Sequence, residues 1–101
     1  MEIRMFNTQT LYLIGVELRL AREKYPTNEN LLPALMEEVG ELAAAVLQVR
    51  FAVMRGDTPA QIQQQRDKIR REALQVITVA GRIIEEGVAE YPETETPTTE
   101  Y

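Results

Sequence analysis

The sequence predicts an all-α fold, a helical bundle of about three long helices per chain that a second subunit completes. Apolar residues recur at three- and four-residue steps along most of the chain, which is helical spacing. Two groups of turn-forming residues, at 25–26 and 55–59, divide this pattern into three segments. A chain of 101 residues forms one domain with a small core, so association with a second copy would stabilise it.

The first helix is expected over residues 8–24. Asn7 or Thr8 can cap its beginning. Tyr25 followed by Pro26 stops it, because a proline disfavours the helical conformation in the residue before it. The apolar residues of this segment lie around most of the helix, which indicates more than one packing partner.

The second helix is expected to begin near Asn30 and to continue to about Met54. Asn30 is the expected N-cap residue, since its side chain can accept a hydrogen bond from the first turn, where Pro33 is tolerated. Gly56 suits a helix that ends in the left-handed conformation.

The third helix is expected from Pro59 to about Glu86. Thr58 and Gln61 have the spacing of a capping box, with a proline at the first helical position between them. This is the sharpest boundary in the sequence. Gly87 is expected to end the helix.

Residues 1–89 are expected to form the single domain, and residues 90–101 an acidic, disordered tail. The tail is rich in Glu, Thr and Pro and almost devoid of aliphatic residues. It carries four acids and no base, whereas the other 89 residues hold 12 acids and 11 bases. The body is therefore nearly neutral, and its lack of a basic face argues against a nucleic acid duplex as a partner.

The composition narrows the chemistry that this chain can perform. It contains no cysteine and no histidine, which removes disulfides, thiolate metal sites and the usual imidazole base. Catalysis must therefore use carboxylates, hydroxyls, lysine or arginine. The uncharged runs are too short to span a bilayer, and the N-terminus does not resemble a signal peptide, so we expect a cytoplasmic protein without a membrane partner.

Three acids stand out in the second predicted helix. Glu37, Glu38 and Glu41 are the only charged residues between positions 31 and 49. Glu37 and Glu41 are a like-charged pair one turn apart, which destabilises an exposed helix by a few tenths of a kcal/mol. Burying such acids without a partner would cost more, and a divalent cation with oxygen ligands would neutralise them.

The third predicted helix offers a matching pair. Glu72 and Gln75 are three residues apart, as are Glu38 and Glu41, so each pair lies on one helix face. Antiparallel packing of the two helices would bring the pairs together, as in metal sites built between facing helices of a bundle. The alternative is that these acids are simply a solvated helix face.

Residues 31–43, LLPALMEEVGELA, resemble the first signature helix of the MazG-like, all-α nucleoside triphosphate pyrophosphatase superfamily. That signature has two adjacent glutamates and a third three residues later, followed after a spacer by a glutamate and an aspartate three apart. Glu37, Glu38 and Glu41 match the three glutamates of the first half, and Glu72 matches the glutamate of the second half, but Gln75 stands where the family has aspartate. The resemblance covers residues 7–86, with a long spacer over residues 42–71.

The resemblance implies a homodimer or homotetramer that hydrolyses a nucleoside triphosphate to the monophosphate and pyrophosphate, using Mg²⁺ or in its place Mn²⁺. The implied catalytic residues are Glu37, which would orient or deprotonate water or bind a second ion, and Glu38. The implied metal ligands are Glu38, Glu41, Glu72 and, more weakly, Gln75. The candidate contacts to the substrate phosphates are Lys68, Arg71 and Arg82, although Lys68 also has the spacing of an ordinary ion pair with Glu72.

Two other interpretations stay open. Because Gln75 carries no charge, the chain can be a non-catalytic nucleotide-binding or assembly module on the same fold. It can also be a helical scaffold whose acids meet arginines, such as Arg50 or Arg55, of a neighbouring subunit.

Overall fold

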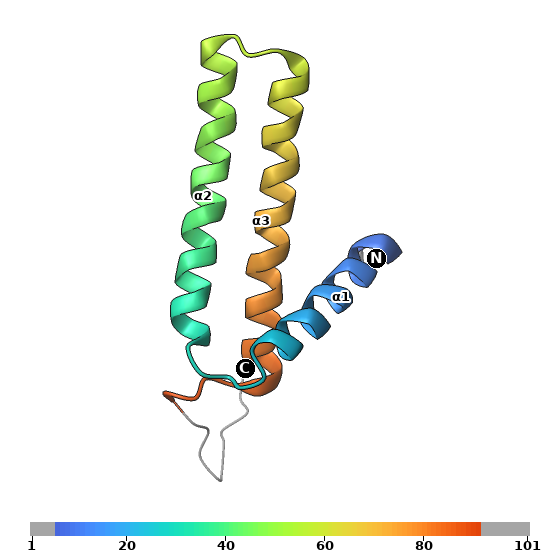
Figure 1. Ribbon diagram of the computed structural model, residues 1–101, viewed down its shortest axis with the longest axis vertical. Helices are drawn as coiled ribbons and strands as arrows, with labels where there is room; N and C mark the ends of the chain where they lie inside the picture. The colour runs from blue at the N-terminus through green and yellow to red at the C-terminus, as the bar shows by residue number, and fades with distance from the viewer. Residues whose placement is uncertain (1–5, 92–101) are drawn as a thin grey trace, which may run out of the picture.

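The all-α prediction is confirmed by a computed structural model that describes residues 6–91. The chain forms three helices in the order α1 (Thr8–Lys24), α2 (Leu31–Arg55) and α3 (Pro59–Glu86), as Figure 1 shows. Within residues 6–91 there is no β-strand, only an isolated bridge between Val88 and Tyr91. The predicted helix boundaries agree with these bounds to within about one residue.

Helices α2 and α3 form a long antiparallel hairpin (Figure 1). Gly56 ends α2 with a φ of 76°, the left-handed conformation that glycine adopts without steric cost. The Thr58 side chain then accepts a hydrogen bond from the Gln61 N–H at 3.2 Å, and the Gln61 side chain accepts one from the Thr58 N–H at 2.9 Å. The predicted capping box is therefore present, and it fixes where α3 begins.

The other two helix beginnings differ from each other. Asn7 caps α1 as predicted, accepting a hydrogen bond from the Thr10 N–H at 2.8 Å. Asn30 precedes α2, but the prediction that its side chain caps the helix is wrong. Its φ of 62° is left-handed rather than extended, and its side chain makes no capping bond. The Asn30 N–H instead donates to Glu90 at 3.2 Å, because a tight turn brings residues 88–91 beside it.

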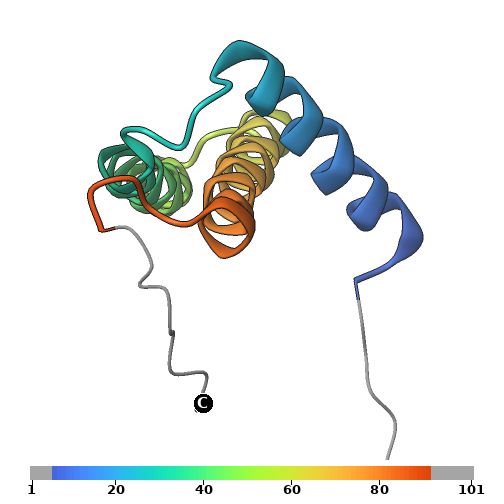
Figure 2. The same ribbon diagram turned by 90° about the horizontal axis from the view of Figure 1, so that it is seen from below.

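Helix α1 packs against α3 and lies to one side of the hairpin (Figure 2). The two helices are held at the base of the fold by Arg82, whose side chain is buried. Its Nη2 donates to the Thr27 carbonyl, and its Nε and Nη2 both donate to the Glu86 carboxylate, all at 2.8–2.9 Å. Arg22 of α1 also donates to Glu86, at 3.3 Å. This polar network lies at the crossing of α1 and α3, where the Leu18 side chain also packs beside Gly81.

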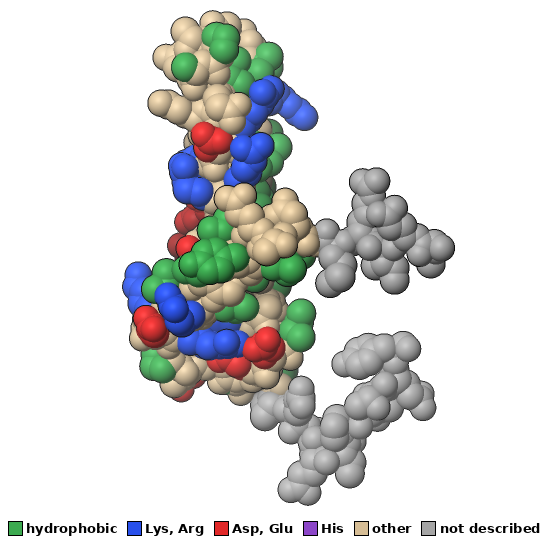
Figure 3. Space-filling view, turned by 90° about the vertical axis from the view of Figure 1, so that its right-hand side faces the viewer, with side chains coloured by type: hydrophobic (Ala, Val, Ile, Leu, Met, Phe, Trp, Pro, Cys, Tyr) green, Lys and Arg blue, Asp and Glu red, His purple; other side chains and the backbone are tan. Residues whose placement is uncertain are grey.

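The apolar core of a single chain is small. Leu31, Ala45 and Ala52 are its fully buried apolar residues within the part of the chain that the structure describes. Many larger apolar side chains are exposed, and Figure 3 shows some of them at the surface between charged residues. None of the described helices is both long enough and apolar enough to cross a membrane.

The predicted acidic tail begins at residue 90 and falls mostly outside the described residues. Its first two residues are placed, since Glu90 contacts Asn30 and Tyr91 bridges to Val88. Residues 92–101 lie outside the described part, so the expectation of disorder there stays a prediction.

Candidate metal centre

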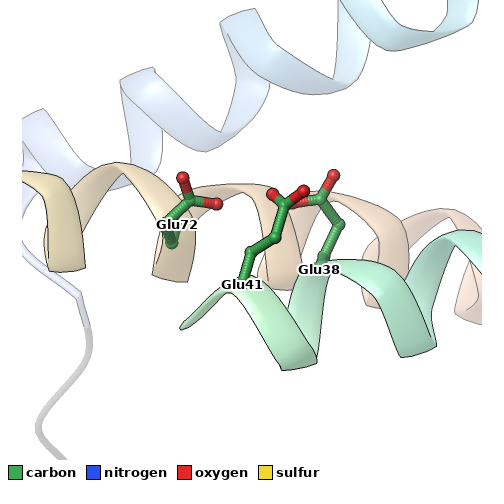
Figure 4. Close-up of side chains that lie close together, drawn as sticks. All are labelled: Glu38, Glu41 and Glu72. Carbon is green, nitrogen blue, oxygen red and sulfur yellow. The ribbon is translucent and has the colours of Figure 1, made fainter. Parts of the chain in front are cut away.

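The antiparallel hairpin brings three of the predicted ligands together. Glu38 and Glu41 of α2 and Glu72 of α3 each place a carboxylate oxygen within 4.8 Å of the others. Figure 4 shows the three carboxyl groups on the same side of the hairpin, the side on which α1 lies. The three-residue step between Glu38 and Glu41 aligns them on one helix, and the antiparallel packing supplies Glu72 from the other.

Helical spacing explains why Glu38 is partly buried. The α2 positions that face α3 follow steps of four and three residues, and Glu38 occupies one of them among apolar neighbours. The other members of this row are Leu31, Leu35, Leu42, Ala45, Val49 and Ala52, none of them exposed. The packing of this row against α3 therefore holds the Glu38 side chain in the helix interface.

The Glu38 carboxylate is incompletely satisfied there. Within residues 6–91, its Oε2 atom is buried and has no hydrogen-bond partner. A buried oxygen without a partner is rare in folded proteins, because it has lost water without gaining a donor. No ion pair of the described region reaches Glu38, Glu41 or Glu72, and the predicted Lys68–Glu72 pair is not formed.

Burial and the crowding of acids raise the pKa values of Glu38 and Glu41. Burial raises the pKa of Glu38 most, and the negative charges of Glu41, Glu72 and Glu37 raise it further. The pKa of Glu41 is raised first by a hydrogen bond shared with the Glu72 carboxyl, then by burial and by the charges of Glu72 and Glu37. Both carboxyls therefore hold their protons to higher pH than an isolated glutamate.

The donor set fits a hard divalent cation. Three carboxylates supply the oxygen ligands that Mg²⁺ and Mn²⁺ prefer, and one of their oxygens has no other partner. Glu38, Glu41 and Glu72 are the residues that would hold the ion.

Gln75, predicted as a weaker fourth ligand, makes a different contact. Its Nε2 donates to Glu17 of α1 at 3.2 Å. Glu17 is a residue that the sequence reasoning missed. It is the only acid between positions 3 and 22, in an apolar helix, and this isolation was the available signal. The Gln75–Glu17 hydrogen bond joins α1 to α3 one turn from Glu72.

The three predicted phosphate contacts lie in different surroundings. Lys68 is half-buried one turn before Glu72, and Arg71 is exposed beside it in the sequence. Arg71 also lines a pocket of about 460 Å³ between α1 and α3, which contains no member of the acidic cluster. Arg82 is only 2% exposed, and Glu86 and Thr27 occupy its guanidinium group. Its predicted role as a phosphate contact is therefore withdrawn in favour of a structural one.

Fold and site together define a helical-hairpin protein with a cluster of three carboxylates between its two long helices. No known protein family matches the chain, and no curated protein or solved structure is detectably similar to it. The MazG-like resemblance therefore rests on the sequence pattern of residues 31–43 and on Glu72, and it stays a prediction.

The raised pKa values make cation affinity depend on pH. We expect the association constant for Mn²⁺ to rise by up to about tenfold per pH unit for each proton displaced, because the ion and the protons compete for Glu38 and Glu41. The rise should continue up to the raised pKa values of Glu38 and Glu41 and level off above them, at a higher pH than for ordinary glutamates. Isothermal titration in buffers of different ionisation enthalpy measures both the affinity and the protons released.

The stability of the cation-free protein should follow the opposite trend. Because the folded-state pKa of Glu38 and Glu41 is raised, the folded chain binds more protons than the unfolded chain, and its stability falls as the pH rises through that range. Adding Mn²⁺ should reverse this loss. A Mn²⁺ association constant that does not change between pH 4 and 7 would contradict the assignment of Glu38 and Glu41 as ligands.

Proposed function

We propose that this protein binds a divalent cation at Glu38, Glu41 and Glu72 and uses it to hydrolyse a nucleoside triphosphate to the monophosphate and pyrophosphate. The observation that carries the cation site is the convergence of three carboxylates around a buried oxygen that lacks a partner. The reaction is proposed from the MazG-like arrangement of Glu37, Glu38, Glu41 and Glu72 in the sequence.

The chain would contribute the carboxylates that hold the cation and a general base that accepts a proton. A bound cation would screen the polyphosphate and act as a Lewis acid toward its oxygens. In the hydrolysis, a water oxygen bonds to the α-phosphorus, the bond from that phosphorus to the α,β-bridging oxygen breaks, and pyrophosphate leaves with the bond's electrons. Glu37 is exposed and adjacent to Glu38, so its carboxylate can accept the proton that the water loses.

Lys68 is the side chain best placed to contact the substrate. It lies on α3 one turn from Glu72 and has no ion-pair partner among residues 6–91. Its ammonium group can approach a phosphate beside the cation site. Arg71 lies next to Glu72 in the sequence and is exposed, so it is the second candidate.

The direct test is a pyrophosphate-release assay across the common ribo- and deoxyribonucleoside triphosphates. It should be run with Mg²⁺, with Mn²⁺ and with chelator. We expect turnover with at least one triphosphate that depends on the cation and falls in the Glu37→Ala variant. A complete absence of turnover would favour a non-catalytic role.

That second role, a non-catalytic nucleotide-binding module, is favoured by Gln75. Its amide carries no charge and is engaged with Glu17, so the fourth carboxylate of the family pattern is missing from the cluster. A site with three carboxylates can bind a cation and a nucleotide without positioning them for attack by water.

Restoring the acid discriminates between the two roles. We expect Gln75→Asp to raise the rate of pyrophosphate release by about tenfold or more, equivalent to about 1.4 kcal/mol, because it adds a negative ligand one turn from Glu72. The matched control is Gln75→Ala, which removes the Glu17 contact without adding charge. No turnover in any of the three proteins would assign the chain to the non-catalytic class, whereas equal non-zero rates would show that hydrolysis does not need an acid at position 75.

A further inference from the structure

Glu17 of α1 is a partly buried acid without a basic partner. No base stands three or four residues from it in the helix, and no ion pair among residues 6–91 reaches it. Its one side-chain hydrogen bond within that range comes from Gln75, whose Nε2 donates to it at 3.2 Å. A carboxylate that has lost part of its water and faces a single neutral donor is incompletely compensated, as Glu38 is.

The register of the hairpin places Gln75 level with Glu38. Helices α2 and α3 run antiparallel, and Glu41 shares a hydrogen bond with Glu72 across them. Three residues back along α2 and three residues on along α3 cover the same distance in the same direction. This step leads from Glu41 to Glu38 and from Glu72 to Gln75. Glu38, Gln75 and Glu17 therefore lie in one layer across the three helices, on the side of the hairpin where the carboxylates gather (Figure 4).

The hydrogen bond with Glu17 determines which atom of the Gln75 amide remains for a cation. An ionised carboxylate only accepts hydrogen bonds, so the amide must present its Nε2 to Glu17. The amide oxygen, which is bonded to the same carbon atom, takes no part in this contact. Oxygens of this type are ligands that hard divalent cations accept. The contact with α1 therefore leaves Gln75 able to act as a ligand, in the orientation that a cation needs.

We propose that Glu17 is a positioning residue of the cation site. Its carboxylate holds the Gln75 amide so that the amide oxygen serves as a fourth ligand beside the three carboxylates. A partner that orients a metal ligand in this way typically changes metal affinity by about 10- to 100-fold when it is removed. The inference rests on the proposed cation site, but not on the hydrolysis of a nucleotide.

The proposed role also joins α1 to the site. Among the described helices, α1 packs on α3 alone, so no direct contact ties it to the two α2 ligands. A cation held by α2 and α3 would stabilise the orientation of Gln75 and, through it, the contact with Glu17. Cation binding should therefore slow amide hydrogen exchange in α1 as well as in the hairpin.

A double-mutant cycle in Mn²⁺ affinity tests whether Glu17 acts through Gln75. Isothermal titration at pH 7 compares the wild type, Glu17→Gln, Gln75→Ala and the double variant. We expect Glu17→Gln to weaken Mn²⁺ binding by at least about tenfold, because a neutral partner lets the Gln75 amide turn over. In the Gln75→Ala background the same substitution should change the affinity by no more than about threefold, since the group that it positions is gone.

Glu23→Gln is the matched control for charge. It removes an acid from the same helix at an exposed position, and its Mn²⁺ affinity should stay within about threefold of the wild type. Helical circular dichroism confirms that each variant is folded. Hydrogen exchange followed by mass spectrometry gives a second readout on the wild type itself: Mg²⁺ should protect α1 around Glu17, and Gln75→Ala should abolish that protection.

Three results would overturn the proposal. A wild-type protein that binds no Mn²⁺ would remove the cation site itself, and with it the proposed function. Mn²⁺ binding that is as strong in Glu17→Gln as in the wild type, or no protection of α1 by Mg²⁺, would leave the cation site standing but remove the role of Glu17. An equal loss of affinity in the wild-type and Gln75→Ala backgrounds would show that Glu17 acts by its charge alone.

Discussion

Glu38→Ala is expected to weaken the binding of Mg²⁺ or Mn²⁺ by at least about 100-fold. Substitution of a group that merely supports a ligand often costs 10- to 100-fold in metal affinity, and loss of a direct ligand should cost no less. Glu38 has the largest role in the cluster, because it provides the buried oxygen without a partner and sits between the two helices. Isothermal titration of the wild-type and variant proteins at pH 7 measures the effect.

Glu37→Ala is the matched control for this prediction. It removes the same charge from the neighbouring position, but Glu37 is exposed and lies outside the three-carboxylate cluster. Its cation affinity should stay within about threefold of the wild type, while its pyrophosphate release should fall. In chelator, Glu38→Ala should be at least as stable as the wild type, since it relieves repulsion among the acids. Equal loss of cation affinity in both variants would show a diffuse charge effect rather than a site.

Arg82→Ala is expected to lower the free energy of unfolding by about 2–4 kcal/mol. The residue is 2% exposed and its guanidinium group donates to both Glu86 and the Thr27 carbonyl, so truncation leaves the Thr27 carbonyl without this donor and Glu86 with Arg22 alone. The value lies somewhat below the 3–5 kcal/mol of a fully buried pair, because the Glu86 side chain is 24% exposed. Urea denaturation followed by circular dichroism measures it.

Arg70→Ala is the control, since that side chain is 78% exposed and pairs only with Asp67 among the described residues. Its effect should stay within about 0.5 kcal/mol. The contribution of Arg82 to the free energy of unfolding should also depend on pH. Hydrogen bonds from Arg82, and then from Arg22, lower the pKa of Glu86 despite its partial burial. The stability from this pair is therefore complete above the ordinary glutamate pKa and is lost as the pH falls through the lowered value. Equal destabilisation by both substitutions would contradict a structural role specific to Arg82.

The helix boundaries were predictable where a local hydrogen bond or a local conformation fixes them. Gly56 and the Thr58–Gln61 capping box act within four residues, so the sequence contains all that is needed. Asn30 shows where this fails. Its conformation depends on Glu90, sixty residues away, and no local pattern reveals that contact. Glu90 accepts from the N–H of Asn30 itself and not from the first-turn N–H groups that a capping side chain would bind. A residue type that suits a cap is thus insufficient when its own backbone takes a left-handed conformation.

The candidate site was predictable to a similar extent. Glu38 and Glu41 stood out because no base accompanies them in their helix, and antiparallel packing was enough to expect Glu72 opposite them. The contact of Gln75 with Glu17 was not predictable, because it depends on the side of α3 on which α1 packs.

Spacing within one helix was enough to predict the number of helices, their bounds and which acids lack a local base. The burial of Arg82 at the base of the fold and the contact of Gln75 with α1 depend instead on how the helices pack together. This packing also decides which apolar side chains stay exposed. The reason is geometric: a helix has several faces, and only the packing of neighbouring helices determines which face is buried and which ionised groups meet.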